Sequence, residues 1–171
     1  MEWIFFPKTC QVPKFLKDTV SVFEAVSDEI DSGANDDETR FHSDGVLKIL
    51  EPGLSDLGYK VERSKKKIDK VRIPVLYGSL GKEELVFEAD AYHEKYQTVI
   101  EVEAGRAVTN YQFLKDIFQA SMMVETEYLI LAVRILYREH NDYETVRKFI
   151  ETVYLTNKVK LDLKGILLVG Y

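Results

Sequence analysis

The chain has little of what marks secreted, membrane-spanning or zinc-binding proteins. Cys10 is the single cysteine in 171 residues, so no internal disulfide can form and we predict an intracellular, cytoplasmic protein. No apolar run is long enough to span a bilayer, and the short acidic opening ends at Pro7, so we expect neither membrane association nor a signal peptide. Three scattered histidines lack zinc-ligand spacing, and no glycine-rich phosphate loop occurs.

The composition is that of an ordinary globular domain. Hydrophobic residues make up 46% and charged residues 30% of the chain, and the length favours a single domain. The net charge of −6 argues against a protein that coats nucleic acid indiscriminately, although it leaves room for a local basic groove. Within one domain we expect an N-terminal helical part at about 1–57, a sheet core at about 58–135 and a C-terminal helix and strand at about 141–171.

Apolar residues at helical spacing predict four helices, and residues 31–44 are polar enough to form a loop. Pro52 should kink the second helix or split it. Asn141 can cap the fourth, with Glu144 in capping-box position. The predicted helices span 14–30, 46–57, 107–124 (with Tyr111, Leu114, Phe118 and Ser121 or Met122 on one side) and 142–154.

Alternating or continuous apolar runs predict strands at 59–63, 71–77, 84–90, 98–105, 127–134 and 161–170. The run at 127–134 is apolar throughout, as expected of a strand that is buried on both faces. A meander of antiparallel strands, followed by a helical crossover to an interior strand, predicts an α/β fold with a mixed β-sheet and helices on both of its faces.

The strands at 84–90 and 98–105 carry most of the functional signal. Residues two apart lie on one side of a strand, so a hairpin with its apolar faces together places Glu88, Asp90, Glu101 and Glu103 on one side. Like charges facing each other across a strand pair are destabilising, and a divalent cation would relieve their repulsion. The alternative is an exposed acidic face on an amphipathic hairpin.

These residues resemble the motif of the PD-(D/E)xK nucleases. Asp90 ends one strand, ten residues separate it from Glu101, and Val-Ile-Glu101-Val-Glu103 lies in the next strand before Gly105 and a helix. Ala89 stands in place of the motif's proline, and Glu103 replaces its lysine. The chain therefore looks most like the restriction endonucleases of BamHI type, whose motif ends in Glu-x-Glu.

The resemblance implies a restriction-endonuclease-like fold, a Mg²⁺ ion for which Mn²⁺ can substitute, and hydrolysis of phosphodiester bonds. It also implies that Asp90 and Glu101 bind the metal, with the backbone carbonyl of Val102 as a third ligand. Glu103 would accept a proton from the attacking water or hold a second metal ion.

The same resemblance suggests further candidates around the site. The family often adds a carboxylate from the helix before the sheet, which here is Asp44 or Glu51. Asp44 fits a helix N-cap equally well. Glu88 is the least certain member of the acidic face, since it can simply be solvated. Lys115, on the helix after the motif, is placed to stand in for the missing lysine.

One segment is strongly cationic. Residues 60–72 carry seven basic residues and two acidic ones. Such a patch can follow a phosphate backbone, and it is equally typical of a solvated loop or of an edge strand protected by lysines. The candidates for contact with nucleic acid are Lys65, Lys66, Lys67, Lys70 and, beyond the acidic strand, Arg106.

The sequence thus predicts a Mg²⁺-dependent DNA endonuclease, working as a homodimer of restriction-enzyme type because two copies match the symmetry of a palindrome. Two alternatives stay open. One is a catalytically degenerate nuclease-fold module that binds DNA or a protein partner without cleavage. The other is an acidic α/β protein of another family that binds Ca²⁺ or a basic partner.

Overall fold

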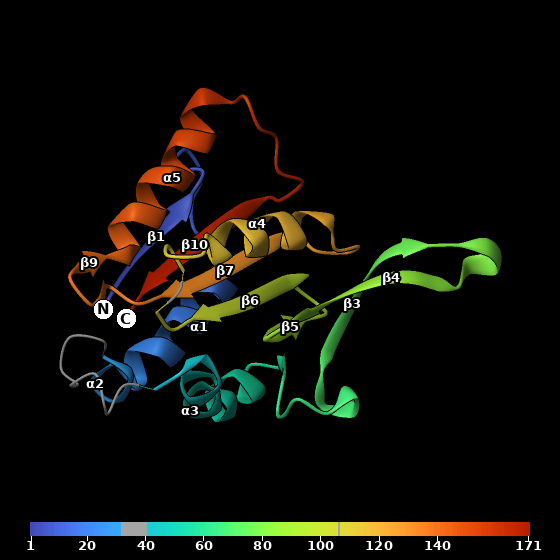
Figure 1. The fold of residues 1–171 in the computed structure, drawn as a ribbon, viewed down its shortest axis with the longest axis horizontal. Helices are drawn as coiled ribbons and strands as arrows, with labels where there is room; N and C mark the ends of the chain where they lie inside the picture. The colour runs from blue at the N-terminus through green and yellow to red at the C-terminus, as the bar shows by residue number, and fades with distance from the viewer. Residues whose placement is uncertain (32–40, 106) are drawn as a thin grey trace.

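A computed structural model describes residues 1–31, 41–105 and 107–171 (Figure 1). Arg106 and most of the predicted loop at 31–44 lie outside these ranges. The helices are α1 (Lys14–Ala25), α2 (Ser27–Ile30), α3 (Ser43–Asp56), α4 (Gln112–Met122), α5 (Asp142–Thr156) and the short 3₁₀ turns η1 (Lys67–Asp69) and η2 (Ser79–Gly81). The strands are β1 (Glu2–Phe6), β2 (Lys60–Val61), β3 (Val71–Tyr77), β4 (Glu83–Ala89), β5 (Ala91–His93), β6 (Thr98–Glu103), β7 (Tyr128–Val133), β8 (Leu136–Tyr137), β9 (His140–Asn141) and β10 (Gly165–Gly170). No helix among the described residues combines the length and the apolar character needed to cross a bilayer.

The main sheet has the strand order β1-β10-β7-β6-β5-β2. Strands β10, β7 and β6 are parallel, whereas β1, β5 and β2 pair antiparallel with their neighbours. Helix α4 connects β6 to its parallel neighbour β7, which is the crossover that the sequence predicts. The prediction of an α/β fold with a mixed sheet is therefore confirmed.

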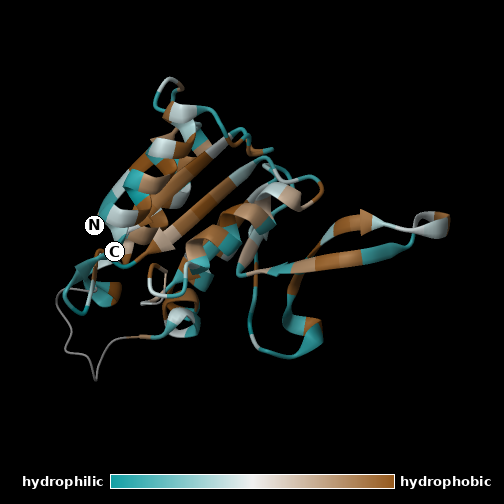
Figure 2. Ribbon diagram, turned by 45° about the horizontal axis from the view of Figure 1, so that its top comes forward, coloured by the Kyte–Doolittle hydropathy of each residue, from teal (hydrophilic) through white to brown (hydrophobic). Residues whose placement is uncertain are grey.

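Helices cover both faces of this sheet because its interior strands are apolar on both sides. Ile100 and Val102 of β6 pack in one core with α1 and α3, whereas Val99 packs in the other core with α4 and α5. Figure 2 shows the hydrophobic interior strands between the helices, whose outer faces are more hydrophilic. The carboxylates of Glu101 and Glu103 alternate with Ile100 and Val102, so they face the α4 side.

Strands β3 and β4 leave the main sheet as a two-stranded ribbon, residues 71–89, which projects away from the body (Figure 1). This differs from the expected hairpin between residues 84–90 and 98–105. Only β5 pairs with β6, through Ala91↔Ile100 to His93↔Thr98, while β4 pairs with β3. The ladder stops at Asp90 because its carboxylate, rather than a backbone carbonyl, accepts the N–H of Val102.

Several local predictions are confirmed. The strand at 71–77 is β3, and the apolar run at 127–134 contains β7, whose last five residues are fully buried. Helix α5 begins at its predicted cap, where Asn141 Oδ1 accepts a hydrogen bond from the Glu144 N–H at 2.7 Å. These features depend on short-range chemistry, which the sequence displays directly.

Helix boundaries needed correction. The helix predicted at 14–30 ends at Ala25, and α2 follows separately. Helix α3 begins at Ser43 and is not split by Pro52. Pro52 lies on the exposed side, where water can hydrate the carbonyl that loses its partner, while Leu50 and Leu54 anchor the helix in the core.

The expected N-terminal helical part, at about 1–57, contains α1, α2 and α3 and also the strand β1, which pairs antiparallel with β10 at the edge of the sheet. Helix α4 begins at Gln112 rather than at Ala107, because Tyr111 has a left-handed backbone conformation with φ 52°. The strand predicted at 161–170 begins at Gly165, where a side chain would clash with the ring of Phe5 at 2.4 Å.

The packing of β7 leads to a stability prediction. Leu131 has no exposed surface, and its replacement by alanine should leave a cavity. We expect Leu131→Ala to lower the free energy of unfolding by about 3 kcal/mol, a fall in Tm of roughly 6–12 °C. Leu80→Ala, on a side chain that is 94% exposed, should change stability by less than about 0.5 kcal/mol. Thermal unfolding measures both, and equal effects would contradict this account of the core.

Candidate metal centre

Three carboxylates form a row across β2, β5 and β6. Lys60 and Val61 pair with Tyr92 and Ala91, and Ala91 pairs with Ile100. One residue further along each strand, this register places Glu62, Asp90 and Glu101 side by side. The Glu62 N–H donates to the Asp90 carbonyl at 2.8 Å, which continues the pairing to this row.

Asp90 lies at the centre of the row. Its Oδ2 accepts a hydrogen bond from the Val102 N–H at 2.8 Å. Burial raises the pKa of Asp90 to about 6, since the charged form loses its hydration. The Val102 hydrogen bond opposes this shift, whereas the negative charges of Glu62 and Glu103 reinforce it.

The two glutamates of β6 share this environment. Burial raises the pKa of Glu101 well above its usual value, and the charges of Asp90 and Asp116 raise it further. Burial also raises the pKa of Glu103, whereas a hydrogen bond with Asp116 acts in the opposite direction. Asp90, Glu101 and Glu103 therefore lie close enough to repel one another, as the alternation of the two strands predicts.

Asp116 of α4 completes the cluster and was missed from the sequence. It is 3% exposed, and in the described part of the chain its Oδ2 has no hydrogen-bond partner. Burial raises the pKa of Asp116 to about 8, and the negative charge of Glu103 adds to the shift. Without a cation, burial therefore favours the protonated form of Asp116.

Asp116 was missed because the sequence analysis grouped Tyr111, Leu114 and Phe118 on one side of this helix and did not consider the opposite side. Tyr111, Phe118 and Met122 are 48–64% exposed, whereas Asp116 lies on the buried side. The inward stripe is Phe113, Asp116, Ile117 and Ala120. An aspartate at spacing three and four from apolar residues was the available signal, because such a position normally carries an apolar side chain.

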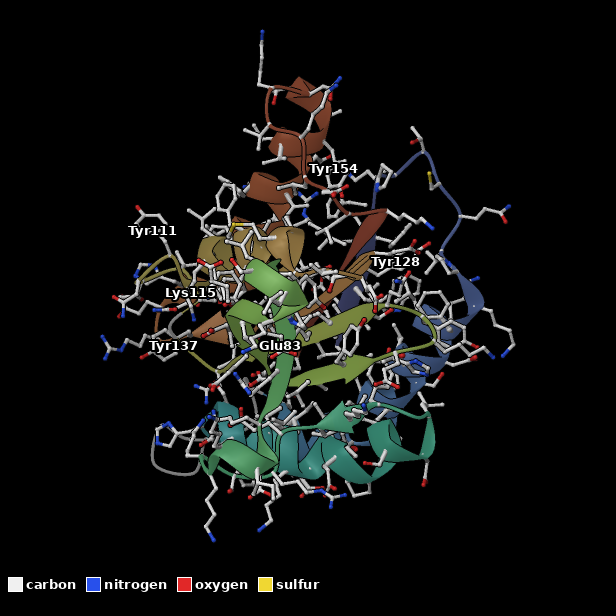
Figure 3. The ribbon with its side chains drawn as sticks, turned by 90° about the vertical axis from the view of Figure 1, so that its right-hand side faces the viewer. Glu83, Tyr111, Lys115, Tyr128, Tyr137 and Tyr154 are labelled. Atoms are coloured by element: carbon white, nitrogen blue, oxygen red, sulfur yellow. The ribbon has the colours of Figure 1, made fainter. Side chains whose placement is uncertain are left out.

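Lys115 lies where the resemblance predicts a compensating lysine. Its Nζ is 3.9 Å from Asp116 Oδ1, and its side chain is 59% exposed. Its charge lowers the pKa of Glu101, Glu103 and Asp116, against the stronger effect of burial. In Figure 3, Lys115 lies on the same side of the molecule as Tyr137, whose ring would clash with any side chain at Gly105, just beyond β6.

The end of β6 is held from several directions. Gly105 has φ 110°, a conformation that favours glycine. The Ala104 N–H donates to Ser43 Oγ at 3.1 Å, and the Tyr171 hydroxyl donates to the Glu103 carbonyl at 3.3 Å. The backbone that carries Glu101 and Glu103 is therefore fixed to α3 and to the residue after β10.

The helix carboxylates lie in a neighbouring pocket of about 340 Å³. Asp44 bonds to Lys65 at 2.9 Å, and Glu51 bonds to Arg63 at 3.1 Å. Glu62 lines the same pocket and so connects it to the row at Asp90. The N-cap interpretation of Asp44 is wrong, because α3 is capped at His42 and Asp44 lies inside its first turn.

The structure places Glu88 away from the cluster. It lies on the ribbon, is 54% exposed and forms an ion pair with Lys70 at 3.2 Å. It belongs to the part of the acidic run that pairs with β3 instead of β6. Of the four carboxylates expected on one face, Glu88 is therefore the one that the topology separates.

The cationic segment is partly neutralised by acidic neighbours. Lys65 contacts Asp44 and Glu62, and Lys70 contacts Glu62 at 2.8 Å. Lys66 and Lys67 are exposed and form no ion pair with any described residue. A phosphate backbone would meet Lys66 and Lys67 directly, whereas it would have to displace carboxylates from the other two.

The donors suit a hard divalent cation. Val102 directs its N–H toward Asp90, and in an extended strand the carbonyl of the same residue points to the same side. The Val102 carbonyl, Asp90 and Glu101 therefore present oxygen ligands to one region. In the described ranges, no three His, Cys, Asp or Glu side chains are already arranged to hold an ion. Mg²⁺ typically takes one or two protein carboxylates and keeps several waters, so the residues fit it.

Comparisons of the chain with protein-family models, with curated proteins and with solved structures find no match. The function is therefore argued from the geometry and chemistry of this cluster.

Proposed function

We propose that this chain is a metal-dependent DNA endonuclease with a restriction-endonuclease-like fold, acting as a homodimer. The observation that carries the proposal is the row at Asp90 and Glu101. Burial raises the pKa of both carboxyl groups, and the charge of Asp90 raises that of Glu101 further, so the two ionised carboxylates destabilise the folded chain unless a cation lies between them. Hard cations bound by oxygen ligands are the usual partners of such a pair.

The residues around this pair suit phosphodiester hydrolysis. A bound Mg²⁺ ion supplies an activated water and stabilises charge on the phosphate oxygens. Asp90, Glu101 and the Val102 carbonyl would hold the ion. Burial moves the pKa of Glu103 upward, toward the range in which a carboxylate works as a general base near neutral pH. Lys115 can place its exposed ammonium group against the phosphate.

The cationic segment and the dimer belong to the same proposal. Exposed Lys66 and Lys67 can contact phosphates, with Lys65 and Lys70 joining them when their carboxylate partners are displaced. Such contacts weaken as salt is added, so DNA binding should fall steeply with ionic strength. Two copies would let one site act on each strand of a duplex.

Removal of the metal tests this function. We expect the purified protein to nick or linearise plasmid DNA in Mg²⁺ or Mn²⁺, to lose this activity in EDTA, and to regain it when the cation is restored. Agarose-gel analysis measures cleavage, and calorimetry measures Mn²⁺ binding. A protein that cuts nothing across many DNA substrates and binds no Mn²⁺ would refute the proposal.

A non-catalytic module is the second candidate. Glu103 in place of lysine and the lack of a preassembled ligand group in the described ranges favour it. This module would bind DNA or a protein in the presence of chelator as well as in its absence. An acidic protein of another family would instead show no DNA affinity even at low salt, where phosphate contacts are strongest.

A further inference from the structure

The ribbon formed by β3 and β4 ends in an apolar tip that no described part of the chain covers. Near its base, Val71 and Ile73 are buried in the core that includes α4. Further out, Leu76 pairs with Leu85 across the ribbon, and both side chains are exposed. Leu80, in the turn η2, is 94% exposed, the highest value among the large hydrophobic side chains of the described residues. The apolar surface therefore continues beyond the body of the protein, as a binding surface does.

Leu80 is also an unusual residue for its place in the turn. Its backbone has φ 63°, a left-handed conformation that bulky side chains adopt rarely and that glycine or asparagine would adopt more easily. A leucine that is both strained and exposed adds nothing to the stability of the single chain. Such a choice favours a contact of this side chain with another molecule.

The charge of the tip favours a protein over a nucleic acid as that molecule. Glu83 and Glu84 lie beside a single lysine, Lys82, and neither glutamate forms an ion pair with a described residue. In Figure 3 the ribbon points toward the viewer, and Glu83 is labelled on it. A phosphate backbone would be repelled by these carboxylates. An apolar tip with an acidic rim suits an apolar hollow with a basic rim.

A pocket of about 1000 Å³ at the base of the ribbon has this complementary chemistry. It lies at the β2 edge of the main sheet, where residues of β2, β3, β5 and η1 line it. Ile68, which is 89% exposed, and Tyr77 contribute apolar surface. Four cations line the pocket against three carboxylates, and one of the four, Arg72, forms no ion pair with a described residue. In an otherwise acidic chain, this pocket can therefore receive an acidic tip.

The exposed apolar area approaches what a stable dimer needs. The exposed side chains of the tip and of the pocket together offer roughly 600 Å² in each copy, of the about 800 Å² that each partner of a stable complex typically buries. The strands β3 and β4 have seven residues each, so the ribbon is roughly 20 Å long. Two ribbons that lie side by side in opposite directions bring each tip to the base of the other, so one two-fold axis covers both tips.

We propose that the ribbon binds a second copy of this chain, with the tip of each copy seated in the pocket of the other. Leu80 of one copy would pack against Ile68 of its partner. Glu84 of one copy would approach Arg72 of its partner. The inference rests on the homodimer of the proposed function and goes beyond it, because the symmetry of a DNA site does not say which surface joins the copies.

Sedimentation in EDTA and without DNA tests this surface independently of metal and cleavage. We expect the wild type to dimerise between about 1 and 100 µM, and Leu80→Asn to associate at least about ten-fold more weakly. Asparagine tolerates the left-handed backbone, so the variant should fold. In dilute solution, where every chain is monomeric, its Tm should be no lower than that of the wild type.

Variants on the pocket and at a matched surface position make the result specific. Ile68→Asn changes an exposed side chain of the pocket and should weaken the dimer as Leu80→Asn does. Reversal of the tip charge in the double variant Glu83→Lys, Glu84→Lys should weaken it as well. Leu155→Asn makes the same change on an exposed leucine of α5, outside tip and pocket, and should dimerise like the wild type.

The outcomes separate this surface from the nuclease proposal. A wild type that stays monomeric up to about 100 µM would overturn the second copy as the occupant. A dimer that Leu80→Asn and Ile68→Asn leave intact, or that Leu155→Asn weakens equally, would overturn the surface and leave the nuclease proposal standing. Loss of DNA affinity in Leu80→Asn with an intact dimer would also overturn it. Dimerisation through the ribbon in a protein that neither cuts DNA nor binds Mn²⁺ would support the surface and refute the nuclease.

Discussion

Glu101→Ala should abolish Mg²⁺-dependent plasmid cleavage, with a loss on the order of 10³-fold or more. The reason is that the Glu101 carboxylate would hold the Mg²⁺ ion that stabilises negative charge on the phosphate oxygens. Glu101 is buried beside Asp90, so burial raises its pKa well above the usual value and the charge of Asp90 raises it further. Removal of its carboxylate deletes one of the two side-chain ligands that Mg²⁺ would use. Time courses on supercoiled plasmid, followed on gels, measure the loss.

Two variants make this result specific. Glu101→Gln preserves size and should lose activity to a similar extent, because a neutral amide is a poorer ligand for a hard cation. Glu24→Ala removes an exposed glutamate from α1, which packs on the opposite face of the sheet, and should cut at the wild-type rate. Thermal melting should show that all three proteins are folded. Wild-type cleavage by Glu101→Gln would contradict the assignment of Glu101 as a ligand.

The metal-free protein should lose stability as pH rises from about 5 to 8. Burial raises the pKa of Asp116 from 3.8 to about 8 and that of Asp90 from 3.8 to about 6, so over this range the folded chain holds protons that the unfolded chain has released. Proton uptake on folding means that stability falls with pH until the folded-state pKa is passed. The loss should be roughly 2–4 kcal/mol after allowance for coupling between the groups.

This fall is measurable as a decrease in Tm of roughly 5–10 °C between pH 5 and 8, in buffer with EDTA. The ion pair that lowers the pKa of Glu144 to about 2 should not contribute, because it is fully formed above pH 5. Asp116→Asn should flatten the profile and raise Tm at pH 8, and Mn²⁺ should do the same to the wild type. A wild-type Tm that rises with pH in EDTA would show that these carboxyl groups are not buried as described.

The local parts of the site could be predicted because they follow from short sequence periods. Alternation in residues 98–103 places Glu101 and Glu103 on one face and Ile100 and Val102 on the other, and the two cores show this division. Asp90 lies beside Glu101 as expected, but through the register of β5 with β6, in which Ala91 pairs with Ile100, and not through a hairpin of β4 with β6. The cap at Asn141 is equally local.

Other parts could not be predicted, because they depend on which segments meet. Glu62 joins the row only through the pairing of β2 with β5, and the sequence around Glu62 does not reveal this register. Glu88 leaves the cluster because β4 pairs with β3 as a separate ribbon. Asp116 enters it because α4 buries the stripe beginning at Phe113 instead of the one beginning at Tyr111.

The amino-acid sequence alone predicted the α/β class, the interior strand β7 and the shared face of Asp90, Glu101 and Glu103. These features follow from side-chain periods of two residues in a strand and 3.6 residues in a helix, which involve only near neighbours in the chain. Tertiary packing alone decided that Glu62 and Asp116 approach those carboxylates and that Glu88 does not. Strand register and the choice of a helix's buried face are set by contacts between residues far apart in the chain, where the free energy of burial outweighs local preference.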